Sequence, residues 1–275
     1  ANNFIHLGNY EEALNHLALV DNPYSNARSL GCFYIQGKKE EYRQKLLELI
    51  KKDKNSIPVA AVSAFVSNQL KQRDPYPFCP NPLDLLFITN LVSFQPNLDK
   101  LFDQVIGEAE FHRLTWENRT TKNGYQSDYK IFETSSPNIK RLKEIILKVI
   151  ESYKLEFANS NCLFVKSWPK SARLTGWFNR LIKNGYQKSH IHPTGWLSGV
   201  VYLKTIDPLK NNEGAIELSL HGYDLPILDE AYPKKVHQPN VGDIVLFPSS
   251  LFHRTIPFTT DGERCVIAFD LVPEI

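Results

Sequence analysis

Apolar residues recur at helical spacing through the first part of the chain. Within residues 9–20, Ala13, Leu14 and Leu17 fall on one side of a helix, behind acidic residues in its first turn. Residues 38–52 repeat this arrangement, and a further apolar stretch, residues 59–70, follows Pro58. The pattern predicts a small helical region over residues 1–73.

Two stretches of this helical region resemble each other. GNYEEALNHL begins at Gly8 and GKKEEYRQKL begins at Gly37, and in each a glycine and polar residues lead to paired glutamates and an apolar stripe. Their separation is close to the period of helical-hairpin repeats, so the region resembles degenerate tetratricopeptide repeats. Ordinary helical packing and a true repeat that binds a peptide both remain open.

A proline-rich segment follows the helical region. Four prolines lie in RDPYPFCPNPLD, residues 73–84, and prevent a helix from continuing there. We predict a hinge and connecting segment over residues 74–110. Residues 138–157 then show the clearest amphipathic pattern of the chain and predict a long helix. The apolar face of this helix carries Leu142, Ile145, Ile146, Val149, Ile150 and Tyr153.

From Cys162 onward the pattern changes to short apolar runs separated by glycine and proline. Several strands of this length with no helix between them predict an antiparallel sandwich or jelly roll over residues 111–275. The chain as a whole is therefore expected to be α+β. The predicted strands are residues 162–170, 173–182, 197–206, 215–222, 243–250 and 264–272.

Composition narrows the function classes. The 275 residues carry a net charge of only +2, which does not favour binding to nucleic acid or to an anionic membrane. No apolar run approaches the roughly 20 residues that cross a bilayer. Four widely spaced cysteines without a CxxC pair suggest reduced thiols, and no signal peptide opens the chain, so we expect a reducing cytoplasm. The oligomeric state stays open.

Three histidines in the β region are candidate metal ligands. His190 and His192 are two residues apart in an extended segment, so both imidazoles can point to the same side. His253 follows the predicted strand 243–250, and a turn there can bring it across the sandwich. Three neutral imidazoles suit Fe(II), Zn(II) or Cu(II) and leave coordination positions free for a substrate.

Further polar residues are placed to help such a site. Arg264 begins the last predicted strand, and its planar guanidinium can hold the distal carboxylate of a metal-bound dicarboxylate. Tyr202, Ser198 and Asn179 can add hydrogen bonds from neighbouring strands. Other possible carboxylate ligands are Asp243 and Glu217. The remaining histidines, His6, His16, His112, His221 and His237, are expected to be ordinary surface or packing residues.

These residues resemble the 2-oxoglutarate- and Fe(II)-dependent oxygenases, and more closely the bacterial members in which tetratricopeptide repeats precede the catalytic domain. The similarity runs from about Thr120 to Pro273, through TTKNGYQSD, WFNRLIKNGYQKSHIHPTGWLSGVVYL, PNVGDIVLFPSSLFHRTIPF and GERCVIAFDLVP. The resemblance implies a double-stranded β-helix. It also implies that His190 and His253 are two ligands of a His-x-Asp/Glu…His triad, in which His192 stands where the carboxylate is expected.

The same resemblance implies the cofactors and the reaction. Arg264 would hold the C5 carboxylate of 2-oxoglutarate, assisted by Tyr202 and, in a comparable place, Asn179. With Fe(II), 2-oxoglutarate and O2, such an enzyme hydroxylates a C–H bond and releases succinate and CO2. Either three histidines coordinate the iron, or His192 does not and water replaces it.

The substrate is not determined by these residues. A groove between helical hairpins favours a peptide or protein, whereas Trp196, Phe252 and Phe258 could line a pocket for a small molecule. Two other functions stay open. One is a metal cupin that has three histidines and does not use 2-oxoglutarate, and the other is a non-catalytic ligand-binding barrel.

Overall fold

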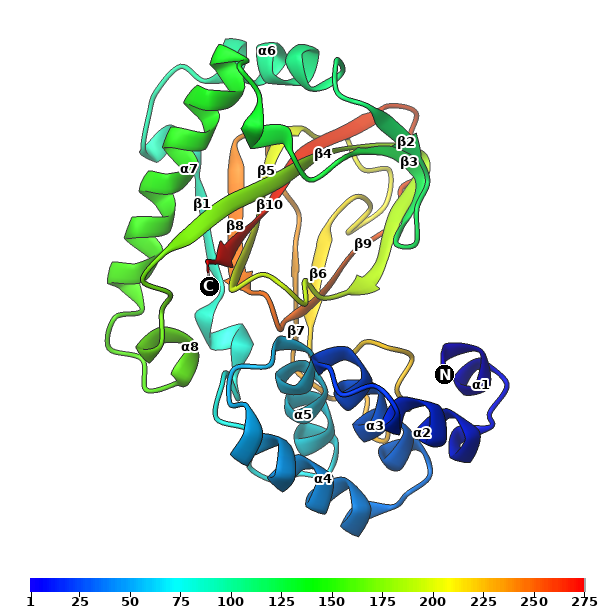
Figure 1. Cartoon of the computed structure of the whole chain (residues 1–275). Coiled ribbons are helices and arrows are strands. Elements are labelled where there is room, and N and C mark those ends of the chain that lie inside the picture. Colours follow the sequence, from blue (N-terminus) through cyan, green and yellow to red (C-terminus); the bar gives the residue numbers. More distant parts are fainter. Residues whose placement is uncertain (275) are drawn as a thin grey trace.

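The chain folds as helices packed around a strongly curved antiparallel sheet (Figure 1). The structure is a computed structural model that describes residues 1–274. The helices are α1 (Asn2–His6), α2 (Tyr10–Ala18), α3 (Pro23–Ile35), α4 (Lys39–Lys52), α5 (Ile57–Gln69), α6 (Asp99–Ala109), α7 (Pro137–Glu156) and α8 (Leu163–Lys166), with short 3-10 turns at Pro82–Leu85, Leu91–Ser93 and Ile131–Glu133. The strands are β1 (Phe87–Asn90), β2 (Leu114–Trp116), β3 (Thr121–Ser127), β4 (Ala172–His190), β5 (Leu197–Lys204), β6 (Ile216–Ser219), β7 (Lys234–His237), β8 (Asp243–Pro248), β9 (Phe252–Thr255) and β10 (Glu263–Pro273).

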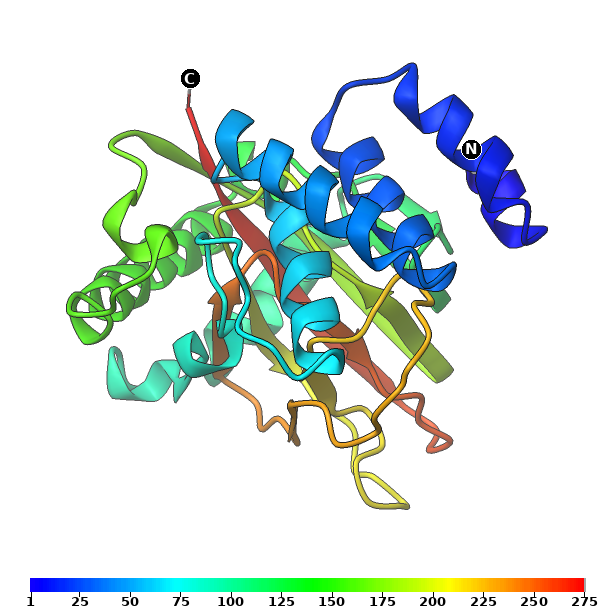
Figure 2. The same cartoon turned by 90° about the horizontal axis from the view of Figure 1, so that it is seen from below.

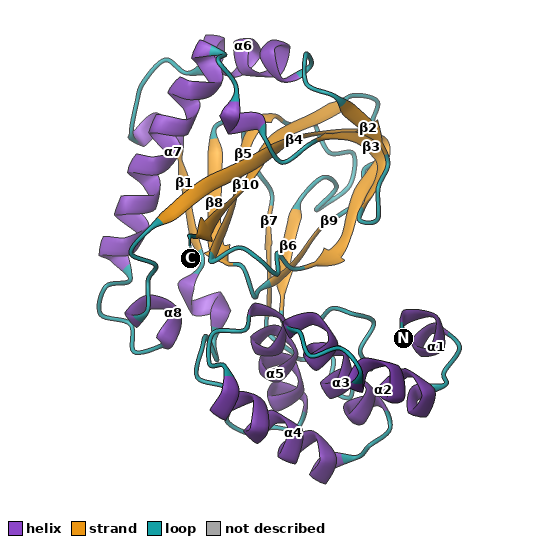
Figure 3. Cartoon of the chain, viewed as in Figure 1, coloured by secondary structure: helices purple, strands orange, loops and turns teal. Residues whose placement is uncertain are grey.

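The strands form a double-stranded β-helix, which confirms the predicted α+β fold. Their order is β1-β8-β5-β10-β4-β9-β6-β7, and β3 pairs with β4 and β2 with β3. Strand β4 belongs to both halves of the barrel, because residues 172–182 pair with β10 whereas Gln187 and His190 pair with β9. The sheet therefore curls, and β6 and β9 face β5 and β8 across its interior (Figure 3).

An irregularity in β4 makes this change of partner possible. Leu181 pairs with Gly124 and Tyr186 with Lys122, so the residues between Leu181 and Tyr186 face only one residue of β3. Asn184 lies in this bulge and has a φ of 64°. A bulge bends a strand and increases its twist, and here it directs the end of β4 toward β9.

Helix α7 covers one side of the barrel with the face predicted from the sequence. Its buried residues include Leu142, Ile146 and Val149, and the helix begins at a proline, whose missing N–H is no loss in a first turn. The hydroxyl of Tyr153 donates to the carbonyl of Leu85 at 2.8 Å, which anchors α7 to the segment before β1.

Helices α1 to α5 lie at one end of the barrel (Figure 2). Almost every residue of α5 is buried, because this helix lies between α3 and the loop that follows β6. Phe65 of α5 packs against Tyr232 of that loop, with ring centroids 6.1 Å apart. On α3, the hydroxyl of Tyr34 donates to the carbonyl of Pro226 at 2.9 Å. One hydrophobic core thus continues from the helices into the barrel.

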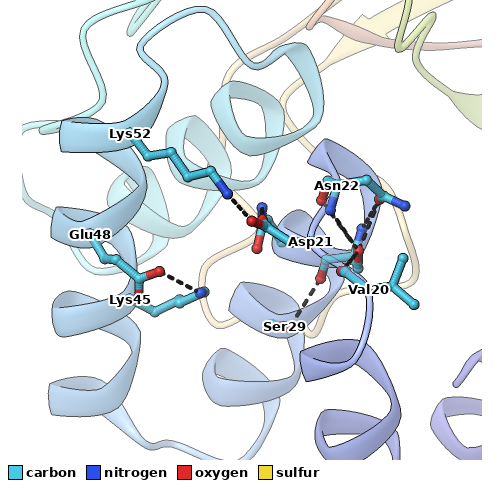
Figure 4. A network of polar contacts seen from close by, with 9 residues as sticks. Val20, Asp21, Asn22, Ser29, Lys45, Glu48 and Lys52 are labelled. Atoms are coloured by element: carbon cyan, nitrogen blue, oxygen red, sulfur yellow. Dashed lines mark hydrogen bonds and ion pairs between the residues drawn. The ribbon is translucent and has the colours of Figure 1, made fainter.

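Polar contacts fix the start of α3 (Figure 4). The side chain of Asn22 accepts from the backbone N–H of Ser25 at 2.8 Å and caps the helix, a contact worth about 1 kcal/mol. Lys52, at the end of α4, forms an ion pair with Asp21 in the loop before α3. Because this pair is exposed, it aligns the two helices but adds little stability.

Some sequence predictions need correction or stay untested. Residues 162–170 are not a strand: α8 forms there, since Phe164 and Trp168, four residues apart, pack on the same aromatic cluster as Trp196. The segment 74–110 contributes β1 to the barrel, where Phe87 pairs with Leu246. The three-part division of the chain and the tetratricopeptide assignment remain predictions.

Among residues 1–274, no helix is both long and apolar enough to span a membrane.

Candidate metal centre and cofactor pocket

Three histidines meet inside the barrel. His190 ends β4 and pairs directly with His253 of β9, while His192 follows two residues after His190. One nitrogen from each of the three imidazoles lies within 4.8 Å of the others. The turn after β8, closed by a hydrogen bond from Leu251 N–H to the Pro248 carbonyl, carries the chain from β8 to β9 and so places His253 opposite His190.

Hydrogen bonds on the outer nitrogens set the tautomer of all three rings. The Nδ1 atom of His190 lies 2.7 Å from the carbonyl of Lys188, and that of His253 lies 3.2 Å from the carbonyl of Leu251. The Nδ1 atom of His192 lies 2.6 Å from a carboxylate oxygen of Asp270. Since all three partners are acceptors, each Nδ1 carries the proton and each Nε2 keeps a lone pair.

The environment keeps two of these rings uncharged. Burial, together with the neighbouring His192, lowers the pKa of His190 to about 4. Burial and the other two imidazoles lower the pKa of His253 well below its ordinary value. Both rings are therefore neutral at neutral pH and can donate a lone pair.

The spacing of the rings suits a cation. The Nε2 atoms of His190 and His192 are 3.3 Å apart, and neither carries a proton to share. Two lone pairs at this distance repel each other unless a positive centre lies beside both. Ligand nitrogens about 2.1 Å from one metal ion are separated by about 3.0 to 3.4 Å, so the observed distance matches metal binding.

Asp270 lies behind His192, and our sequence analysis missed it. Its carboxylate accepts from the hydroxyl of Ser198 at 2.7 Å as well as from His192. The hydroxyl oxygen of Ser198 is also hydrogen-bonded to that of Ser249 at 2.8 Å. Asp270 could have been found by alternation, because it continues the inward row of β10 that begins at Arg264.

A glycine leaves space for this network. A Cβ atom on Gly195 would lie 2.6 Å from the hydroxyl oxygen of Ser249 and 3.0 Å from Cγ of Asp270. The Thr-Gly after the paired histidines thus allows the turn to approach the buried carboxylate. Ser198, predicted to contact the cofactor, has its hydroxyl directed to Asp270, His192 and Ser249 in this structure.

Arg264 points into the same interior as the histidines. It lines a small cavity together with His190, His192 and His253, and only 2% of its surface is exposed. Its Nε donates to the carbonyl of Gly214 at 3.0 Å, but the buried Nη1 has no partner among the described residues. A buried cationic donor without an acceptor is costly, so an anionic ligand is the natural partner of this group.

Two neutral groups next to Arg264 also lack partners. Val266 pairs with Tyr202 on one side and with Asn179 on the other, so these side chains form one row across the sheet. The Tyr202 hydroxyl and both amide atoms of Asn179 are buried without a hydrogen bond in the described part of the chain. The guanidinium carbon of Arg264 lies 4.8 Å from the centre of the Tyr202 ring.

Other candidates lie elsewhere. Asp243 is hydrogen-bonded to His237 at 3.0 Å, and Glu217 accepts two hydrogen bonds of 2.9 Å from Arg254. Neither of these two possible carboxylate ligands belongs to the group formed by the three imidazoles. The three aromatic residues considered for a small-molecule pocket, Trp196, Phe252 and Phe258, are buried in the packing instead.

Residues 175–270 match the protein family described as "Putative 2OG-Fe(II) oxygenase". This range contains the three histidines, Arg264 and Asp270. This part of the barrel matches the 2-oxoglutarate- and Fe(II)-dependent oxygenases. The comparison with curated proteins found no match.

Solved structures are similar to the oxygenase barrel at low identity. A prolyl-4-hydroxylase from Pseudomonas putida is 11% identical, with a TM-score of 0.48 over 69% of this chain and 93% of that one. HygX from Streptomyces hygroscopicus, crystallised with nickel and 2-oxoglutarate, is 16% identical, with a TM-score of 0.49 over 69% and 83%. A prolyl hydroxylase from Trichoplax adhaerens, in complex with a hypoxia inducible factor peptide, is 15% identical, with a TM-score of 0.47 over 77% and 89%.

The residues of this oxygenase barrel fit an iron ion and a dicarboxylate. Three lone-pair nitrogens converge on one point, and a buried guanidinium with a free donor lines the same cavity. The barrel departs from the His-x-Asp/Glu pattern at His192, but Asp270 places a carboxylate directly behind that imidazole.

Proposed function

We propose that the protein is an Fe(II)- and 2-oxoglutarate-dependent dioxygenase that hydroxylates a C–H bond of its substrate. The observation that carries this proposal is the convergence of three Nε2 lone pairs and the unpaired Arg264 donor on a single buried cavity. A structural arginine would be paired with a carboxylate, and structural histidines would not direct bare nitrogens at one another.

Each residue has a distinct task in this proposal. His190, His192 and His253 hold Fe(II), and Arg264 binds the C5 carboxylate of 2-oxoglutarate, with the Tyr202 hydroxyl and the Asn179 amide as further donors. When bound, Fe(II), 2-oxoglutarate and O2 supply the oxidising chemistry and release succinate and CO2. Apolar residues such as Val266, Ala268 and Phe247 line the cavity and exclude water from it.

The decisive experiment is turnover without the unknown substrate. The protein is loaded with Fe(II) under anaerobic conditions, then given 2-oxoglutarate and O2, and succinate is measured. We expect succinate to form. Iron binding without succinate would instead support a cupin that does not use 2-oxoglutarate. Failure to bind iron would support a non-catalytic barrel.

Replacing Asp270 by asparagine is expected to lower the affinity for Fe(II) by about 10- to 100-fold, because a carboxylate on the outer nitrogen orients an imidazole ligand and makes it more basic. The affinity is measured anaerobically by competition with a chromophoric chelator. Asp243→Asn is the matched control, since Asp243 also bonds to a histidine, His237, but outside the cavity. Equal losses in both variants would contradict this function of Asp270.

Iron and 2-oxoglutarate are expected to bind cooperatively. Three neutral imidazoles give the bound metal one more net positive charge than a two-histidine, one-carboxylate site, so a dicarboxylate ligand stabilises it more. Fe(II) titrations under argon, with and without saturating 2-oxoglutarate, test this. Affinities that do not differ would reject the coupling.

We also propose that the protein works in a reducing cytoplasm. The proposal is supported by the four cysteines, Cys32, Cys79, Cys162 and Cys265, all of which are free thiols. Fe(II) itself requires reducing conditions to persist, which agrees with this setting.

A further inference from the structure

A large cleft extends from the metal centre to the N-terminal helices. Its volume is about 2350 Å³, and it is lined by His190 and His192 at one place and by Tyr24 and Arg28 of α3 at another. Pockets for small molecules usually have volumes of about 300 to 1,000 Å³. This cleft is large enough for a segment of polypeptide.

Two arginines converge on one phenol in the wall of this cleft. Arg28 donates through Nε to the hydroxyl of Tyr24 at 3.1 Å. Arg119, in the loop between β2 and β3, donates to the same oxygen at 3.2 Å. Arg28 also stacks on Tyr223, with its guanidinium carbon 4.3 Å from the ring centre. We call Tyr24, Arg28, Arg119 and Tyr223 the arginine platform.

The arginine platform lacks a countercharge. Among residues 1–274, neither Arg28 nor Arg119 forms an ion pair with a carboxylate, although Arg254 in the same cleft is held by Glu217 through two hydrogen bonds. Burial opposes ionisation of Tyr24, yet its pKa lies below the ordinary value because Arg119 and Arg28 donate to its hydroxyl. The platform is therefore a point of positive potential.

The rest of the cleft lining does not neutralise this charge. Six basic and four acidic side chains line the cleft. Two of the acids are already engaged, because Glu217 binds Arg254 and Asp270 binds His192. Arg113, Arg173 and Lys188 also line the cleft without an ion pair among the described residues, against Asp128 and Asp224, so the cleft keeps an excess of positive charge. The platform is the place in it where two guanidinium groups meet at one atom.

We propose that the arginine platform binds an acidic segment of a polypeptide substrate while another part of that segment lies at the metal centre. This inference rests on the proposed function and names the substrate class. A peptide is favoured over a small acid because the platform and the metal centre lie on different elements of one large cleft. Tyr24 and Tyr223 add aromatic surface that a peptide side chain can cover.

The test measures binding in the absence of turnover. Two fluorescent peptides are used, one with glutamates spaced by glycine and serine and one with lysines at the same positions. Fluorescence anisotropy is recorded with the full-length, metal-free protein, so a failure here is distinct from a failure to form succinate. We expect the glutamate peptide to bind at least about tenfold more tightly, and its affinity to fall as salt is added.

Variants assign the binding to the platform. Arg119→Gln is expected to weaken binding of the glutamate peptide about fivefold, the effect of losing one partly exposed ion pair. Arg43→Gln on α4 is the matched control, because Arg43 is exposed outside the cleft and its loss changes the net charge equally. The control should bind as the wild type does.

Three results would overturn the proposal. Equal affinities for the two peptides would show that the cleft does not select acidic segments. Equal affinities of Arg119→Gln and Arg43→Gln for the glutamate peptide would show that the platform is not the binding site. Competition by citrate at the same concentration as the glutamate peptide would assign the site to small anions instead. The unfolding temperature of Arg119→Gln is compared with that of the wild type. If Arg119 only connects α3 to the barrel, its loss should lower the unfolding temperature without weakening the glutamate peptide more than the lysine peptide.

Discussion

His253→Ala is expected to abolish iron retention and succinate formation. The substitution removes one of only three lone-pair donors, and changes in groups merely bonded to such ligands already cost about 10- to 100-fold in metal affinity, so a larger loss is expected here. His253 also lies on β9 directly beside His190 of the neighbouring strand β4, and its removal leaves the metal held only by the end of β4 and the residue that follows it. Anaerobic Fe(II) binding and succinate release provide the two measurements.

A control separates ligand loss from general damage. His16 lies on α2 and has a half-exposed side chain beside Glu12, so His16→Ala should retain both iron and activity. His253→Asn keeps a polar group of smaller size in the barrel, in case the alanine variant does not fold. Wild-type iron affinity in a folded His253 variant would exclude His253 from the metal site.

Arg264→Ala should retain iron and lose 2-oxoglutarate. Removing one partner of a buried, hydrogen-bonded charge pair costs about 2 to 5 kcal/mol, which raises the dissociation constant roughly 30- to 5,000-fold. The free protein should tolerate the change, because Arg264 has a buried donor without a partner in the described structure. Calorimetric titration of 2-oxoglutarate into the Fe(II)-loaded protein under argon measures the effect.

The form of the Arg264 side chain matters as well as its charge. Arg264→Lys keeps the positive charge but loses the planar fork that binds a carboxylate through two contacts, so an intermediate affinity is expected. Arg254→Gln is a suitable comparison, since Arg254 is bonded to Glu217 instead. If Arg264→Ala bound 2-oxoglutarate as tightly as the wild type, the assignment of the C5 carboxylate to this residue would be wrong.

Much of the architecture was predictable from local pattern. The amphipathic stripe of residues 138–157 predicted α7 and its buried face, because helical periodicity is independent of what the helix packs against. The spacing of His190 and His192 likewise placed both side chains on one side of an extended segment. Residues 162–170 gave the wrong answer, since a short apolar run fits a strand or a helix, and the aromatic cluster around Trp196 decided between them.

The network behind the histidines was not predictable in the same way. Asp270 is 78 residues from His192, and nothing near it in the sequence indicates that it meets an imidazole. The arginine platform joins α3 to the loop between β2 and β3, 95 residues later. Such contacts depend on how strands and helices are arranged in space, and one sequence does not specify that arrangement residue by residue.

The sequence by itself determined the types of donor, three imidazoles and a guanidinium in the β region, and the order in which they occur. Only the tertiary structure decided that they share a cavity, that each histidine has its proton on the outer nitrogen, and that the Asp270 carboxylate lies behind the imidazole of His192. The physical reason is that tautomers and unpaired charges are set by neighbours within about 3 Å, and curling of the sheet brings together neighbours that are remote along the chain.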